Sequence, residues 1–224
     1  METDDKIQYA IEHTEVIRPL RQSLATFGTT NVSYYLVTEL MKGTSVVREG
    51  KVIAERPKIV TPAYLINLEG FSEQAKRFIQ MMAEKHPHEP GVFYRYKNEP
   101  REMNIVPKPM RAVVDDINAR IDSQNDPLSA VIRGVEELWD VSLLKFTYEL
   151  TRSSMYRNVV ELERSGLLNV DEAGVPGDAR SYIDELFEEA KRDSSKAPQL
   201  VVELRRWGLF REYQDRFFNL FRGR

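Results

Sequence analysis

The sequence predicts an α+β protein. Of its 224 residues, 42% are apolar and 30% are charged, which is enough apolar material for a folded core under a well-solvated surface. Up to residue 107, short runs rich in Val, Ile and Tyr are separated by Gly and Pro turn signals, which indicates strands and hairpins. Beyond Pro107 and Pro109, apolar residues recur at helical spacing. We therefore predict an α+β domain with two hairpins over 1–107 and a helical domain over 108–224.

The first domain is predicted from alternation and from turns. Ile7, Tyr9 and Ile11 alternate with polar or small residues, as in a half-buried strand. Ser72 is suited to cap a helix that follows it. In chain order, the expected elements are a strand at 7–11, a strand at 31–38, a hairpin of 45–48 and 51–55 around Glu49-Gly50, a helix at 72–86, and a hairpin of 92–97 and 102–106 around residues 98–101.

The second domain is predicted from apolar stripes. Met110, Val113, Val114, Ile117 and Ile121 recur at intervals of three and four and indicate one helix. An N-cap followed by proline indicates that another helix begins at 126–127. That helix is expected to carry Val131, Ile132, Val135 and Leu138, within a helix-turn-helix-like unit over 126–168. An acidic helix is expected at 178–193, since Tyr182, Ile183, Leu186, Phe187 and Ala190 fall on one side of it. Aromatic-basic helices follow within 197–222, divided after Trp207.

The most informative stretch is 141–168, which has the spacing of two short helices joined by a tight turn. Thr151 is expected to cap the second helix through its hydroxyl, and Gly166 is expected to end it in a left-handed conformation. The apolar side chains expected to face a three-helix core are Leu144, Leu150, Met155, Val159 and Leu162.

Residues 128–170 resemble bacterial helix-turn-helix and winged-helix DNA-binding proteins. The resemblance is carried by Leu150, Thr151, Arg152, Ser153, Ser154, Met155, Tyr156, Arg157, Val159, Leu162 and Gly166-Leu167-Leu168. It implies a DNA-associated regulatory protein whose helix 152–165 enters the major groove of double-stranded DNA. The implied DNA-facing side chains are Arg152, Ser153, Ser154, Tyr156 and Arg157.

Two positions depart from that family pattern. Glu149 stands where a small residue is usual, and Val160 is apolar where a solvated residue is expected. The alternative interpretation is a plain bundle of three amphipathic helices. The charge balance also weighs against DNA, because the net charge is −3 and a basic excess occurs only over 196–224, with seven basic and three acidic side chains. Any DNA binding therefore has to come from a local patch.

The C-terminal stretch alternates aromatic residues with arginines. Its candidate interaction residues are Trp207, Phe210, Tyr213, Phe217 and Phe221. Such a stripe can cover the protein's own core, bind a second copy or another protein, or lie on an anionic membrane surface. The second possibility supports the alternative function, a non-catalytic protein-interaction or assembly subunit that forms a homo-oligomer or binds a protein partner.

Other chemistry has little support in the sequence. Cysteine is absent, which excludes disulfides, thiolate metal ligands and a cysteine nucleophile. A phosphate loop, a nucleophile elbow and a zinc-protease motif are also missing, and His86-Pro87-His88 fits a loop better than a metal site. We therefore predict no cofactor, no metal and no recognisable catalytic residues, although an enzyme assembled from distant residues stays possible. An acidic start and the lack of an apolar run of about 18 residues predict a cytoplasmic protein without a membrane span.

Overall fold

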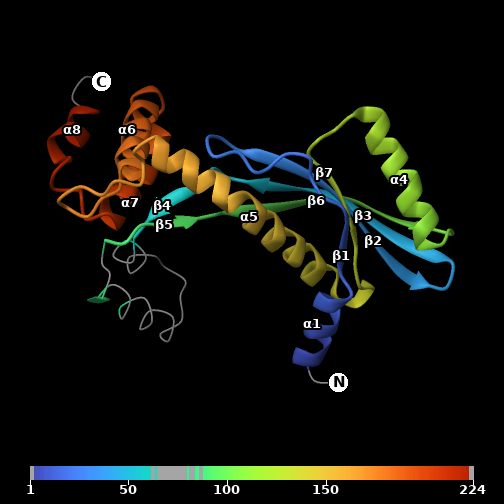
Figure 1. The fold of residues 1–224 in the computed structure, drawn as a ribbon. Coiled ribbons are helices and arrows are strands. Elements are labelled where there is room, and N and C mark those ends of the chain that lie inside the picture. The colour runs from blue at the N-terminus through green and yellow to red at the C-terminus, as the bar shows by residue number, and fades with distance from the viewer. Residues whose placement is uncertain (1–2, 62–63, 65–79, 81–83, 86–87, 222–224) are drawn as a thin grey trace. The chain divides into compact units, whose positions relative to one another are not determined.

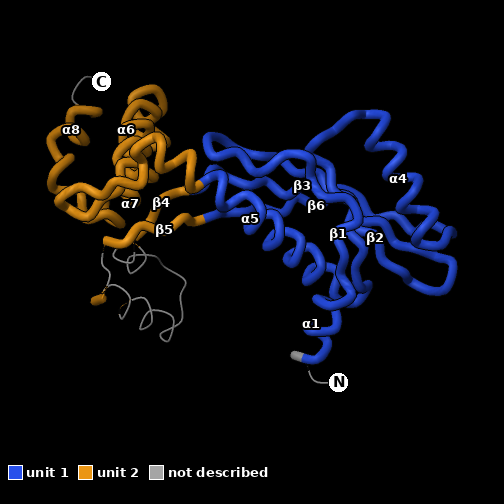
Figure 2. The backbone as a smooth tube through the Cα atoms, viewed as in Figure 1, with its two compact units in different colours: residues 1–57, 94–158 blue, residues 58–93, 159–224 orange. Residues whose placement is uncertain are grey.

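The computed structural model describes residues 3–61, 64, 80, 84–85 and 88–221. The described chain forms two compact units, of which unit 1 contains Met1–Pro57 and Tyr94–Asn158 and unit 2 contains Lys58–Phe93 and Val159–Arg224 (Figure 2). These units do not coincide with the predicted domains of 1–107 and 108–224, since each contains two separate pieces of the chain. The helix predicted at 72–86 lies outside the described residues except at 80 and 84–85.

Unit 1 is built on a mixed sheet with the strand order β1-β7-β2-β3-β6, which confirms the α+β class (Figure 1). Strands β2 and β7 are parallel, and the other neighbours are antiparallel. The elements of unit 1 are α1 (Thr3–Glu12), β1 (Glu15–Arg18), β2 (Thr30–Met41), β3 (Thr44–Ala54), β6 (Tyr96–Val106), α4 (Met110–Gln124), β7 (Ser129–Arg133), the short 3-10 helix η1 (Glu136–Leu138) and α5 (Trp139–Arg164), whose last six residues belong to unit 2.

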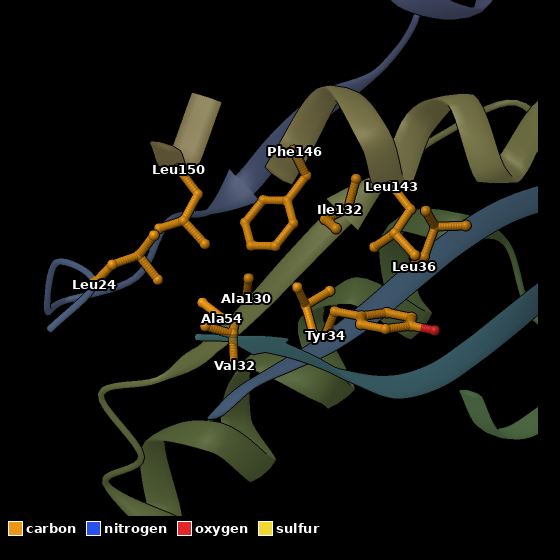
Figure 3. Packing of buried hydrophobic residues seen from close by; sticks show 11 residues of the cluster. Leu24, Val32, Tyr34, Leu36, Ala54, Ala130, Ile132, Leu143, Phe146 and Leu150 are labelled. Carbon is orange, nitrogen blue, oxygen red and sulfur yellow. The ribbon is translucent and has the colours of Figure 1, made fainter. Parts of the chain in front are cut away.

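Helices α4 and α5 cover opposite faces of this sheet (Figure 1). Strand β2 shows why: Tyr34 and Leu36 point toward α5, whereas Tyr35 and Val37 point toward α4, because successive side chains of a strand alternate between the faces. Four of the five predicted residues form the buried stripe of α4, and the fifth, Met110, is partly buried against the same core, which confirms that helix. On the other face, Leu143, Phe146 and Leu150 of α5 pack onto the strands (Figure 3).

The helix predicted from residue 126 is wrong, because residues 129–133 form strand β7. Asp126 does not cap a helix; its carboxylate accepts hydrogen bonds from the Leu128 amide at 2.9 Å and the Ser129 hydroxyl at 2.7 Å. Four successive residues of β7, from Ser129 to Ile132, are buried, as in a central strand covered on both faces. Such a run has no period of two, so it resembles a buried helix in sequence.

Both predicted hairpins are also placed differently. Glu49-Gly50 lies inside the continuous strand β3, and the turn lies at Lys42-Gly43. Residues 98–101 lie inside β6, where Gly50 pairs with Pro100, while Glu49 pairs with Glu102. Gly50 is required for packing rather than for a turn, since a Cβ atom there would overlap the Tyr34 ring and lie 2.8 Å from the Glu99 carbonyl oxygen. The register shift leaves Arg101 as an extra residue in edge strand β6.

The strand predicted at 7–11 is wrong as well, because these residues belong to helix α1. Ala10 is fully buried, whereas Ile7, Tyr9 and Ile11 are exposed. Three alternating residues are too short a pattern to separate a strand from a helix end. The strand of this region is β1, which begins three residues beyond α1 and pairs with β7.

The predicted helix-turn-helix is not present, since residues 139–164 form one uninterrupted helix. Two physical reasons account for this difference. Between Gly134 and Gly166 the sequence has neither glycine nor proline to break a helix. Thr151 does not act as an N-cap, because its hydroxyl donates to the Thr147 carbonyl oxygen one turn earlier, at 2.7 Å. Gly166 does end the helix as predicted, with a φ angle of 70°.

Unit 2 contains a small antiparallel sheet and a helical core. The sheet pairs β4 (Lys58–Val60) with β5 (Gly91–Phe93). The helices that lie wholly within its described residues from 177 onward are α6 (Gly177–Arg192), α7 (Ala197–Arg206) and the short α8 (Gln214–Asn219), with the 3-10 helix η2 (Ser194–Lys196) between the first two. Ile183, Leu186 and Phe187 form the buried stripe of α6, as its spacing predicts. The carboxylate of Asp178, 1% exposed, accepts the Ile59 amide at 3.0 Å and links α6 to β4.

Candidate interaction surface

The predicted DNA-facing residues lie on α5, and the structure separates them. Arg152, Ser153, Tyr156 and Arg157 are exposed, whereas Ser154 is completely buried. The Ser154 hydroxyl accepts the Leu24 amide at 3.0 Å and therefore fastens the helix inside unit 1. Ser154 cannot contact a ligand in this arrangement.

Two residues predicted to face a core are exposed instead. Leu144 and Met155 have exposed fractions of 69% and 43%, while Leu150 and Leu162 are buried. The prediction followed an apolar stripe, but α5 carries two such stripes on opposite sides. One stripe packs on the sheet, and the other belongs to the solvent-facing side.

The outer face of α5 is defined here by Leu144, Tyr148, Arg152, Met155 and Tyr156. At about 100° per residue, these positions lie within about 60° of one line along the helix, opposite the buried stripe. Tyr148 and Tyr156 are 65% and 82% exposed. An exposed apolar stripe along the middle of a helix face is typical of a site that another molecule covers.

The outer face is held in place by its surroundings. The Nζ atom of Lys145, one residue beyond Leu144, donates to the carbonyl oxygens of Ile11 at 2.9 Å and Thr14 at 2.7 Å, near the end of α1. A lysine at this place also offsets the partial negative charge of the α1 C-terminus. Together with the buried stripe, these bonds fix the position of α5 on the sheet, so the outer face is preformed.

The outer face has little net charge. Residues 139–158 include three basic side chains, Lys145, Arg152 and Arg157, and two acidic ones, Asp140 and Glu149. Lys145 is already engaged by the carbonyl groups of Ile11 and Thr14, and its Nζ atom lies 3.7 Å from Glu149. The face therefore combines aromatic and aliphatic side chains with one central arginine, which is the composition of protein interface cores.

A groove of about 460 Å³ lies beside the outer face, between α5 and the segment that follows β1. Its apolar lining includes Val16, Leu20, Phe146 and Leu150. The polar lining includes Arg21, Gln22, Ser23, Glu149 and Ser153. A groove of this kind can receive an apolar side chain of a bound protein, next to the exposed stripe.

A polar cluster also lies at the carboxyl ends of the parallel strands β2 and β7. Arg48 donates to both carboxylate oxygens of Glu136, at 2.6 and 2.8 Å, and the Thr38 hydroxyl donates to the same carboxylate. The Trp139 ring lies over the Arg48 guanidinium at 5.2 Å. The Arg48 hydrogen bonds lower the pKa of Glu136, so this carboxylate stays ionised and is a poor general base. We assign the cluster a structural role.

This cluster gives a prediction for pH dependence. Glu136→Gln is expected to lower the free energy of unfolding by about 1–3 kcal/mol near pH 7, because the mostly buried Arg48 side chain is left without a charged partner. The pKa of Glu136 is lower in the folded chain than its ordinary value of 4.5, so the pair stabilises the fold fully above that value. This contribution is lost as pH falls through the lowered pKa, and the difference between variant and wild type should shrink there.

Urea unfolding at about pH 7 and about pH 3 measures this difference. Glu137→Gln is the matched control, because the neighbouring Glu137 side chain is 80% exposed and lies 3.8 Å from Lys6. It should change stability little at either pH. Equal stability of Glu136→Gln and wild type near neutral pH would contradict the structural role.

The C-terminal aromatic residues mostly cover the protein's own core. Trp207, Phe210, Tyr213 and Phe217 are partly buried against the α6–α7 core of unit 2. Phe221 is the exception, with an exposed fraction of 45%. Four of the five candidate interaction residues therefore cover the protein's own core, which was the first of the three alternatives.

Within the part of the chain that the structure describes, no group of three or more His, Cys, Asp or Glu side chains is arranged to hold a metal ion. No helix among the same residues is long and apolar enough to cross a membrane. Comparison of the chain with protein-family models, curated proteins and solved structures gave no match. The outer face of α5 is therefore the candidate functional surface.

Proposed function

We propose that this protein is a non-catalytic protein-interaction module that binds its partner through the outer face of α5. The observation that carries the proposal is the exposure of Leu144, Tyr148, Met155 and Tyr156 along one helix face. Burying a large apolar side chain is worth about 1.5–3 kcal/mol. Two tyrosines and an arginine at the centre of the stripe are the residue types that dominate binding energy at protein interfaces.

Charge favours a protein over duplex DNA as the partner. DNA recognition requires a basic patch that neutralises several phosphates. The described helix offers three basic side chains against two acidic ones over 139–158, and one of the basic groups, Lys145, is bound to backbone carbonyls. The apolar side chains Leu144 and Met155 contribute nothing to phosphate contacts, whereas they fit the apolar core of a protein interface.

Photocrosslinking tests the proposal. Benzoylphenylalanine at position 156 is expected to form a covalent adduct with a polypeptide in cells that naturally express the protein. The same group at position 111, an exposed arginine on α4, is the control. Adducts at 156 that are absent at 111 support the proposal, and equal yields at both positions overturn it. DNA binding would replace the proposed function under three conditions. Purified protein would be retained on duplex DNA in a salt-dependent way, Arg152→Glu would abolish this retention, and position 156 would give no polypeptide adduct.

A further inference from the structure

Four residues of the outer face of α5 are evenly spaced along the helix. Leu144, Tyr148, Arg152 and Tyr156 are spaced four residues apart, and their midpoint is residue 150. Reversing the helix about this midpoint exchanges Leu144 with Tyr156 and Tyr148 with Arg152. When the two-fold axis is perpendicular to the helix, the two copies run antiparallel, and each residue faces the residue that this reversal puts in its place.

The helical repeat specifies which side chains would meet in such a pair. At about 1.5 Å per residue, Tyr148 lies at the same height as Arg152 of a second, antiparallel copy. An arginine over a tyrosine ring is attracted to the ring face, and the symmetry forms this contact twice. Leu144 lies on the same side of the pair as Met155 of the second copy, and the two differ by about one residue in position along the helix axis. They therefore form an apolar contact, which the symmetry repeats at the other end of the pair.

The acidic group beside the stripe supports the same orientation. Glu149 is partly exposed and lies on the flank where Arg152 of the antiparallel copy approaches, so opposite charges meet. In a parallel pair, Arg152 would face Arg152 and Tyr148 would face Tyr148 at equal heights. Like charges would then meet at the centre, which disfavours the parallel arrangement.

We propose that the outer face of α5 binds a second copy of this chain as an antiparallel, two-fold symmetric helix pair centred near residue 150. This inference rests on the proposed function and names its partner. The helix is already anchored to the sheet by Leu143, Phe146 and Leu150, so the face is preformed.

Sedimentation equilibrium over a concentration series tests the self-association. Wild-type protein is expected to approach twice its chain mass of 26.0 kDa as concentration rises. Arg152→Glu should weaken the dimer by about 10-fold or more, because it removes both cation–π contacts and brings the new carboxylate of one copy near Glu149 of the other. Arg111→Glu, the same change at the exposed arginine on α4, should leave the dimer unchanged. Circular dichroism confirms that both variants fold.

Cysteine cross-linking tests the orientation, and the absence of native cysteine makes the result clean. An equimolar mixture of Tyr148→Cys and Arg152→Cys proteins should form mixed disulfide dimers faster than either variant forms a dimer with itself. A parallel pair would give the opposite order. Faster homotypic cross-linking, or a dimer that Arg152→Glu does not weaken, overturns the helix pairing.

The two proposals can fail separately. A protein that stays monomeric at all concentrations overturns the self-association. Position 156 could then still give adducts whose mass differs from that of two chains. In that case the protein binds another polypeptide, and the proposed function holds. If position 156 gives no more adduct than position 111, the proposed function falls as well.

Discussion

Phe187→Ala is expected to lower the free energy of unfolding by about 3–5 kcal/mol, the cost of deleting a buried aromatic side chain and leaving a cavity. Phe187 is fully buried at the centre of the unit 2 core. Its ring stacks against Tyr213 with centroids 5.6 Å apart, and the Arg216 guanidinium lies 4.1 Å above the ring. Both groups connect the α8 region to α6, so the substitution loosens the C-terminal aromatic segment together with the core.

Phe218→Ala is the matched control for this effect, because Phe218 carries the same side chain on α8 but is 47% exposed. Urea denaturation monitored by circular dichroism gives both free energies. Phe218→Ala should cost about 1 kcal/mol or less, as surface substitutions usually do. Comparable losses for the two variants would contradict the packing described for unit 2.

Asn158→Ala is expected to cost about 2–4 kcal/mol, because it removes three hydrogen bonds inside unit 1. The Asn158 amide donates to the Leu24 carbonyl oxygen at 3.0 Å and to the Thr26 hydroxyl at 2.7 Å. Its side-chain oxygen accepts the Tyr94 hydroxyl at 2.9 Å. Burial raises the pKa of Tyr94 to about 12, so this hydroxyl is a reliable donor at neutral pH.

The control for this substitution is Asn104→Ala. Asn104 is exposed on β6, and its amide makes a long bond of 3.4 Å to Glu102. Thermal unfolding should separate the two variants by several degrees. An Asn158→Ala protein that melts with wild type would show that these buried groups find other partners.

Long apolar stripes were the most reliable guide to the fold. Helix α4 and helix α6 occur where Val113, Ile117 and Ile183 predict them, because a regular spacing over several turns has one explanation. The run at β7 has no such spacing, since both of its faces are buried. Its neighbour β2 is almost 100 residues away in the chain, so no local signal could reveal the pairing.

The residues at 152–157 are candidates from a helix-turn-helix pattern that the structure does not have. Thr151 is as well suited to bond back to the previous turn as to cap a new helix, and the absence of glycine and proline favours the former. Leu144 and Met155 were assigned to a core because sequence spacing alone cannot say which of two apolar stripes meets the sheet. The Arg48–Glu136 pair joins residues 88 positions apart and could only be found from the structure.

Strand β6 limits how copies of this chain can join. An uncovered strand at the end of a sheet is a template on which further chains can add and polymerise. Here Pro100 lacks an amide hydrogen, and the extra Arg101 disrupts the regular row of backbone groups. Both features disfavour the addition of a further strand at this edge, and the proposed helix pair is closed by its two-fold symmetry.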